Sequence, residues 1–262
     1  MVNMRMFFFS CMIGAGLIAT SCSSNEEISS SDNKGFIQLS VKADATFSVP
    51  LSRAVNEENY KDVNNYQVQI LNSSDNKVVK EYASLSEVPE KVELNNGSYT
   101  LKAFYGTDND ASRTDFYVEG TSSFAIQGEA QSVTVNCAPV CGKVIANFDP
   151  TMVDYFSDYS IIYETKALST AGKTAVWSKT DTEPWYLKVN KAGEEIKATI
   201  QITRKSDNKS STVEKTYTLA PNKSWTLKIA PQDSNGSLGI VIEIDESTND
   251  HEVDIEVPSD WV

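Results

Sequence analysis

Histidine is almost missing from this sequence of 262 residues, which contains only His251, and cysteine is sparse, with four. A serine–histidine–aspartate triad would have to use that histidine, yet no Gly-x-Ser-x-Gly elbow is present. One histidine and so few cysteines cannot supply a zinc ligand set. No Walker loop occurs, and the one Gly-x-Gly sequence (Gly14, Gly16) lies in an N-terminal apolar segment. The sequence therefore predicts a protein that is not an enzyme and carries no metal or cofactor.

Paired carboxylates are the remaining catalytic candidates, because glycoside hydrolases use two of them. Asp108 with Asp110, and Asp245 with Glu246, lie in turn-like stretches, and spacing alone does not place any pair in a cleft. The eight acids within residues 243–260 lack the spacing and the glycine of a calcium-binding loop. We interpret these acids as solvated strand faces.

Basic residues are also few, 23 Lys and Arg against 36 Asp and Glu, for a formal net charge of −13. A surface of this sign repels phosphate backbones and anionic lipid headgroups. Nucleic acid is therefore excluded as an expected partner.

No apolar run is long enough to span a bilayer. The longest covers residues 6–19, with Arg5 before it, and extends about 21 Å as a helix, whereas a span needs about 20 residues. Residues 1–21 are therefore predicted to be a signal peptide for export.

Small residues, Ala19-Thr20-Ser21, close this segment directly before Cys22. The arrangement resembles the lipobox of bacterial lipoproteins, although Ala19 stands where leucine is commonest and Leu17 lies two residues earlier. The resemblance implies lipidation of Cys22 by acyl chains such as palmitate, so the expected partner is a membrane. The alternative is an ordinary signal peptide cut nearby, with Cys22 incidental.

Residues 22–34 are rich in serine and poor in apolar groups, which indicates a flexible tether. The early pair Glu26-Glu27 resembles the acidic export signal of Bacteroidetes lipoproteins. That likeness implies a lipid-anchored protein on the outer membrane that faces the cell exterior. The alternative is that both glutamates are simply part of a soluble linker.

Period-two alternation dominates the chain from residue 35 onward. It predicts seven strands in residues 35–138, an N-terminal β-sandwich. The expected strands are 37–43, 66–70, 78–82, 92–94, 99–105, 124–126 and 133–137.

Residues 139–262 predict a second, C-terminal β-sandwich. Its expected strands are 144–148, 159–163, 186–189, 196–202, 213–219, 225–229, 238–244 and 253–257, with a short helix capped by Asp149 and Pro150. The fold class is thus all-β, two tandem antiparallel sandwiches joined by a short connection near residues 138–140. So short a connection predicts that the domains pack together with little freedom.

Two sets of side chains are candidate sites. Trp177, Trp185 and Tyr186, with Trp225, could stack on a sugar, although such aromatics more often fill a sandwich core. Cys137 and Cys141 lie about 13 Å apart in a straight strand, too far for a disulfide, but a kink at Pro139 could bring them together. The alternative is two reduced, half-buried thiols.

The mature chain resembles a family of Bacteroidales lipoproteins known by a domain of unknown function, number 4493. The likeness lies in the lipobox, the opening strand 35–45, the turn 94–101, the Phe148-Asp149-Pro150 sequence and the closing residues 257–261. More distantly, the layout resembles the fimbrillin superfamily, whose lipidated precursors fold as two transthyretin-like sandwiches and form pili or anchors. That likeness implies a candidate proteolytic processing site at Arg53, beyond the first strand. The alternative is that Arg53 is an ordinary loop residue.

We therefore expect a cell-surface lipoprotein with a structural, adhesive or pilus-associated role, whose partners are other surface or pilus proteins. The alternative is a glycan-binding surface lipoprotein of a polysaccharide-utilisation system. Resemblance of fold is a weak reason to assign function.

Overall fold

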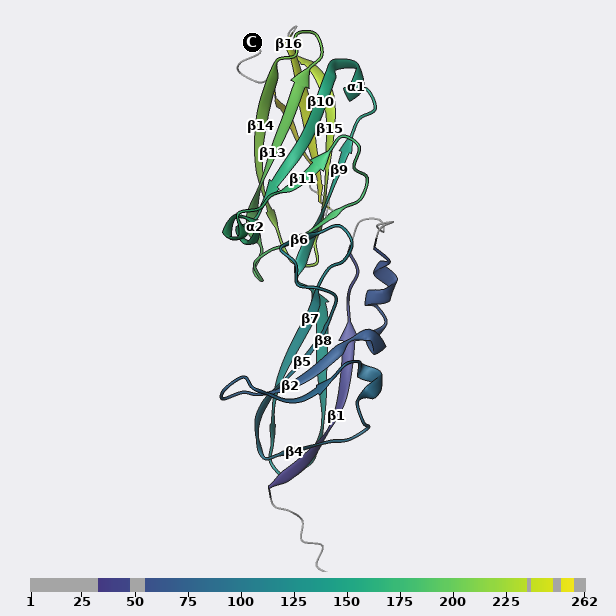
Figure 1. Cartoon of the computed structure of the whole chain (residues 1–262), viewed down its shortest axis with the longest axis vertical. Coiled ribbons are helices and arrows are strands. Elements are labelled where there is room, and N and C mark those ends of the chain that lie inside the picture. The colour runs from purple at the N-terminus through teal and green to yellow at the C-terminus, as the bar shows by residue number, and fades with distance from the viewer. Residues whose placement is uncertain (1–32, 48–54, 235–236, 247–250, 257–262) are drawn as a thin grey trace, which may run out of the picture. The chain divides into compact units, whose positions relative to one another are not determined.

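Strands occupy most of the chain in the computed structural model of the protein (Figure 1). It describes residues 33–47, 55–234, 237–246 and 251–256, the last stretch for its backbone only. The described residues all belong to one compact unit, Asn33–Val262. The all-β class is confirmed.

All seven strands expected before residue 139 are present, with one short addition, β6. The strands of this N-terminal half are β1 (Lys34–Ala43), β2 (Gln67–Asn72), β3 (Val78–Tyr82), β4 (Val92–Asn95), β5 (Gly97–Tyr105), β6 (Ala111–Ser112), β7 (Val118–Ile126) and β8 (Ala130–Pro139). Three turns of 3-10 helix, which the sequence did not predict, are η1 (Glu57–Tyr60), η2 (Val63–Asn65) and η3 (Leu85–Glu87).

The C-terminal half contains the eight strands expected after residue 139, plus β11. Its strands are β9 (Cys141–Phe148), β10 (Phe156–Glu164), β11 (Ala175–Ser178), β12 (Trp185–Lys188), β13 (Glu194–Arg204), β14 (Ser210–Leu219), β15 (Ser224–Ser234), β16 (Ser237–Glu246) and β17 (His251–Glu256). Its helices are α1 (Met152–Tyr155) and α2 (Lys166–Ala171), of which α2 was not expected.

The start of α1 differs in detail from the prediction. Thr151 is its N-cap, and the Asp149 carboxylate accepts hydrogen bonds from the backbone N–H and the hydroxyl of Thr151. Asp149 therefore closes a turn before the helix instead of capping it.

One pairing scheme occurs in both halves. In the first, β1 pairs with β4 and β8, β2 with β3 and β5, and β5 with β7. In the second, β9 pairs with β12 and β15, β10 with β11 and β13, and β13 with β14. The halves thus share these pairings, to which the second half adds β16 and β17. They differ in that β7 also pairs with β8, which joins the first half into one sheet of order β3-β2-β5-β7-β8-β1-β4, whereas the second half is divided between the sheets β11-β10-β13-β14 and β17-β16-β15-β9-β12-β6.

The strand pairs are antiparallel as predicted, with two exceptions. The β1–β8 and β9–β15 pairs run parallel. In each case several strands intervene in the sequence between the two partners. A short hairpin requires antiparallel neighbours, but strands far apart in sequence are free to pair either way, and alternation of side chains does not encode direction.

The buried side chains form two hydrophobic clusters. The N-terminal cluster contains Ile37, Tyr66, Leu101 and Val135, and it also takes in Cys141 and Tyr186 from the C-terminal half. The C-terminal cluster contains Trp177, Ile200 and Leu227. The expected boundary between residues 138 and 139 stays a prediction, because Asn33–Val262 form one unit.

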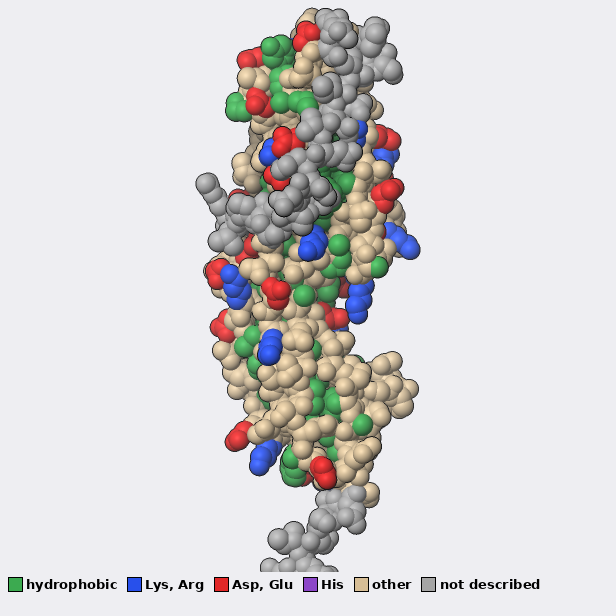
Figure 2. Space-filling view, turned by 180° about the vertical axis from the view of Figure 1, so that it is seen from behind, with side chains coloured by type: hydrophobic (Ala, Val, Ile, Leu, Met, Phe, Trp, Pro, Cys, Tyr) green, Lys and Arg blue, Asp and Glu red, His purple; other side chains and the backbone are tan. Residues whose placement is uncertain are grey.

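Charged side chains are dispersed over the surface. Figure 2 shows acidic and basic groups interspersed on the face drawn there, with no large patch of one sign. No described helix has the length and apolar character needed to cross a membrane.

Candidate functional site

The junction between the two halves is where most predicted site residues meet. Only Val140 separates β8 from β9, and its N–H donates to the Tyr117 carbonyl at 3.0 Å. Strand β6 of the N-terminal half pairs with β12 of the C-terminal half, so that Ser112 lies opposite Tyr186. The halves are therefore joined by a strand ladder as well as by the chain.

A buried polar triad lies at this junction. The Lys143 Nζ is 2.8 Å from Oε1 of Glu57, and the Tyr186 hydroxyl donates to the same oxygen at 2.6 Å. The Lys143 and Glu57 side chains are 0% and 2% exposed. Because the partners come from η1, β9 and β12, this pair binds the two halves to each other. Loss of one partner would leave a buried charge, which costs about 3–5 kcal/mol.

Aromatic rings enclose the triad. The Lys143 ammonium lies 5.8 Å from the Phe47 ring and 5.9 Å from the Tyr186 ring. Phe116 stacks between Tyr186 and Tyr60, with centroid distances of 4.9 and 3.8 Å. Burial raises the pKa of the Tyr60 phenol, which accepts a hydrogen bond from the Phe116 N–H. This dry setting strengthens the Lys143–Glu57 attraction.

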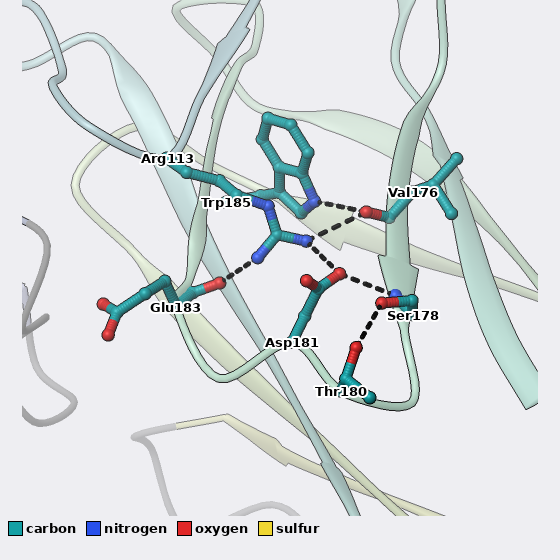
Figure 3. Close-up of polar contacts among 7 residues, drawn as sticks. All are labelled: Arg113, Val176, Ser178, Thr180, Asp181, Glu183 and Trp185. Atoms are coloured by element: carbon teal, nitrogen blue, oxygen red, sulfur yellow. Dashed lines mark hydrogen bonds and ion pairs between the residues drawn. The ribbon is translucent and has the colours of Figure 1, made fainter.

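Arg113, just after β6, forms a second cluster across the junction (Figure 3). Its guanidinium donates to the carbonyls of Glu183 and Val176 and pairs with Asp181 at 2.8 Å. Burial lowers the pKa of Arg113, and the Asp181 carboxylate opposes that shift. Five donors in a rigid fork suit arginine to several acceptors at once.

The same guanidinium covers Trp185, lying 4.3 Å from the ring centroid of that tryptophan and 5.0 Å from that of Trp177. The Trp185 Nε1 donates to the Val176 carbonyl at 3.0 Å (Figure 3). Arg113 therefore occupies the face that a sugar ring would need.

The candidate glycan-stacking platform is not formed. Trp177 is 0% exposed in the C-terminal cluster, and Tyr186 is 2% exposed in the N-terminal cluster. Trp225 is buried as well. Their apolar surface fills the two cores, so these three side chains do not present a ring face to a sugar.

The family is shown by comparison of the sequence with known families. The profile of the domain of unknown function DUF4493 matches residues 33–259. The chain belongs to this family. A comparison with curated proteins finds no relative.

The chain is also similar to solved structures from Bacteroides and Parabacteroides species. One is a candidate cell adhesion protein from Bacteroides eggerthii, at 11% identity and a TM-score of 0.42, covering 87% of this chain and 95% of that one. Another is a fimbrial assembly protein from Parabacteroides distasonis, at 12% identity and a TM-score of 0.41, covering 85% and 98%. A candidate polysaccharide-binding protein from Bacteroides thetaiotaomicron has 13% identity and a TM-score of 0.40, covering 82% and 98%. These likenesses are remote, so no function passes to this chain from them.

Cys137 and Cys141 are free thiols in this family member. Cys137, near the end of β8, directs its Sγ to the Ala103 carbonyl at 3.5 Å, and Cys141 begins β9. Burial raises the pKa of each thiol to about 12. Both are therefore protonated and unreactive at neutral pH.

Asp108 and Asp110, the candidate acid pair, each lie beside a different lysine. Asp108 pairs with Lys188 at 2.7 Å, and Asp110 lies 3.9 Å from Lys173. Within the described part of the chain, no group of three or more His, Cys, Asp or Glu side chains could hold a metal ion.

Two predicted sites, Cys22 and Arg53, lie outside the described residues. Lipidation and processing there stay predictions. The predicted strand 253–257 corresponds to β17, which pairs with β16.

Sequence reasoning missed Glu57, Lys143 and Arg113. A weak signal existed for Lys143, a single charge within the apolar sequence Cys-Gly-Lys-Val-Ile-Ala. Glu57 and Arg113 lie in polar segments and carry no such signal.

Proposed function

We propose that the protein is a non-enzymatic structural or adhesive component of the cell surface, held at the outer membrane by acyl chains on Cys22. The observation that carries the structural part is the junction, where a one-residue connection, the β6–β12 ladder and a buried ion pair join two all-β halves. Such a junction transmits force between the halves instead of bending as a hinge would.

The anchor is proposed from sequence. The 14-residue apolar run is too short for a span, the small residues end at Cys22, and an acidic, serine-rich tether follows. Several acyl chains hold a protein firmly, whereas one chain holds only marginally.

Cell fractionation tests the anchor. Cys22→Ala should move the protein from the membrane fraction to the soluble fraction, while Cys11→Ala, a change within the apolar run, should leave it membrane-bound. Retention of the Cys22→Ala protein in membranes would refute lipid anchoring.

Protease added to intact cells tests the outward orientation. The folded part should be digested without opening the outer membrane. Digestion only after the outer membrane is opened would place the protein in the periplasm.

Pilus association is a narrower proposal and depends on Arg53. Strand β1 pairs with β4 on one side and β8 on the other, so removal of β1 would expose two unpaired edges to a donor strand. Trypsin digestion of the purified protein should then cut at Arg53, release β1 and give ladders on sizing. A nicked but monomeric chain, or no cut, would leave the role of a monomeric adhesin or an anchor.

Glycan binding is the second candidate function. The tryptophans do not support it, because they are buried or covered by Arg113. The observation that favours it is a separate pocket beside the junction, lined by both polar and apolar residues.

A further inference from the structure

We propose that the pocket beside the junction binds a neutral carbohydrate, held between the N-terminal and C-terminal halves. The proposal deepens the glycan-binding candidate and rests on it. It names a site that shares no side chain with the candidate tryptophan platform.

The pocket lies where the β7–β8 ladder ends. This ladder has two pairs, Val118 with Pro139 and Glu119 with Ala138. Beyond them the strands come close at Gly120, where a Cβ atom would lie 2.2 Å from the Asn136 carbonyl oxygen. The resulting hollow has a volume of about 500 Å3, within the range of about 300–1,000 Å3 usual for small-molecule sites.

Both halves contribute walls. The N-terminal half and the connecting residue supply Asp108, Tyr117, Glu119, Gly120, Thr121, Asn136, Ala138, Pro139 and Val140, and the C-terminal half supplies Lys188, Val189, Lys191 and Pro221. The Lys188 N–H donates to the Asp110 carbonyl, and the Asn222 N–H donates to the Cys141 carbonyl. The walls are thus fixed by the junction before any ligand arrives, which lowers the entropic cost of binding.

The charges that line the pocket cancel. Asp108 and Glu119 are balanced by Lys188 and Lys191. The Asp108–Lys188 pair is 2.7 Å apart, and Oε2 of Glu119 accepts from the Tyr117 hydroxyl at 2.9 Å and lies 2.7 Å from Lys102. In a chain with a net charge of −13, a locally neutral pocket favours an uncharged ligand.

Hydrogen-bonding capacity remains in this lining. The bonds above use one oxygen of each carboxylate, and the second oxygen has no hydrogen-bond partner among the described residues. Thr121 and Asn136 are exposed and supply a hydroxyl and an amide, which both donate and accept. The hydroxyl groups of a sugar have the same dual character.

Apolar groups complete the site. Ala138, Val140 and Pro221 are half-buried residues of the pocket wall, backed by the buried Pro139 and Val189. The half-buried residues offer a surface for the C–H face of a sugar ring. A second hollow, of about 660 Å3, lies over β10, β13 and β14, but outward strand side chains such as Ser160, Gln201 and Thr212 line it, without comparable apolar walls.

Saturation-transfer NMR on the full mature chain carrying Cys22→Ala tests the proposal. The probes are glucose, galactose, mannose, N-acetylglucosamine, maltose and lactose, with glucuronate as the anionic comparison. At least one neutral sugar should bind with a Kd of about 1–10 mM, and glucuronate should bind more weakly.

Variants locate the binding. Asn136→Ala and Thr121→Val should each weaken binding about fivefold, the effect of one lost hydrogen bond. Thr134→Val is the matched control, because Thr134 is an exposed threonine on β8 outside the pocket. Failure of all six neutral sugars to bind, or binding that neither pocket variant weakens, would overturn the proposal. Those results would leave the structural and anchoring proposals intact, since fractionation and surface digestion test them separately.

Discussion

In the N-terminal half the outer edge of β4 has no strand partner among the described residues, whereas β12, the corresponding strand of the C-terminal half, pairs there with β6. The other edges differ too. β8 meets β7 over two residue pairs, while β15 is covered by β16 and then β17. Strand β6 of the N-terminal half thus pairs with an edge of the C-terminal sheet that would otherwise be unpaired.

The C-terminal half in turn contributes residues to the core of the N-terminal half. Tyr186 and Cys141 belong by sequence to the C-terminal half but pack in the N-terminal cluster. The two halves are therefore not independent of each other. The N-terminal half supplies an edge strand to the C-terminal sheet, and the C-terminal half supplies side chains to the N-terminal core. Four experiments test this comparison of the two halves.

The largest effect is expected from the triad. Glu57→Ala leaves the Lys143 ammonium buried without its carboxylate, which should lower the free energy of unfolding by about 3–5 kcal/mol in urea titrations. All four tryptophans follow residue 140, so their fluorescence reports the C-terminal half, and its midpoint should shift although Glu57 lies in the other half.

Glu93→Ala is the control for this change. Its partner Lys34 lies at 2.6 Å, but the two side chains are 48% and 46% exposed, so the loss should be about 0–1 kcal/mol. Equal losses for the two variants would contradict the coupling. Glu57→Leu combined with Lys143→Met should recover much of the stability, because an apolar pair needs no desolvation of charge.

Removal of the Arg113 guanidinium should have the next largest effect. Arg113→Ala removes the hydrogen bonds to two backbone carbonyls and the ion pair with Asp181. This should lower the free energy of unfolding by about 1.5–3 kcal/mol. Arg113→Lys should not restore the loss, because one ammonium cannot reproduce the fork. Thermal unfolding followed by tryptophan fluorescence measures both variants. Full restoration by lysine would show that charge alone matters at this position.

Gly35 in β1 and Gly142 in β9 occupy corresponding positions in the two halves. A Cβ at Gly142 in β9 would meet the Leu219 side chain at 2.3 Å, and one at Gly35 in β1 would meet the Ile126 side chain at 2.8 Å and the Glu129 carbonyl oxygen at 2.6 Å. Gly142→Ala and Gly35→Ala should each destabilise by about 1–3 kcal/mol.

A second substitution should restore stability at one of these two positions but not at the other. Addition of Leu219→Ala removes the atoms that clash at Gly142, so part of the loss should be regained in urea titrations. Addition of Ile126→Ala should not rescue Gly35→Ala, because the Glu129 oxygen belongs to the backbone. Equal rescue at both sites would contradict the claim that the Glu129 backbone limits the space at Gly35.

The smallest effect concerns the thiols. Burial raises the pKa of Cys137 and Cys141 from 9.0 to about 12, so the folded state keeps protons that the unfolded state loses above pH 9. The stability due to these thiols is complete below pH 9 and declines as the pH rises toward 12. The Cys137→Ala/Cys141→Ala variant should therefore lose less stability than the wild type between pH 8 and pH 10. Both native thiols should also resist alkylation at pH 8 until urea unfolds the chain, and rapid labelling of the folded protein would contradict their burial.

The strand content was predictable because it depends on local pattern. Alternation placed every long strand, and the polar turn at residues 72–76 was correct, with Asn76 at a φ of 55°, which asparagine tolerates. The short pieces β6, β11 and α2 were missed because two to six residues carry too little periodicity.

The sequence by itself determined the all-β class, the two strand-rich regions and the family, because each follows from residue types and their spacing along the chain. Only the tertiary structure decided that β1 and β9 pair in parallel with β8 and β15, and that Tyr186 fills the core of the other half. It alone brought Glu57 to Lys143 and Arg113 to Trp185. Those contacts join residues about 70 or more positions apart, and their energy comes from burial, which no local pattern of residues encodes.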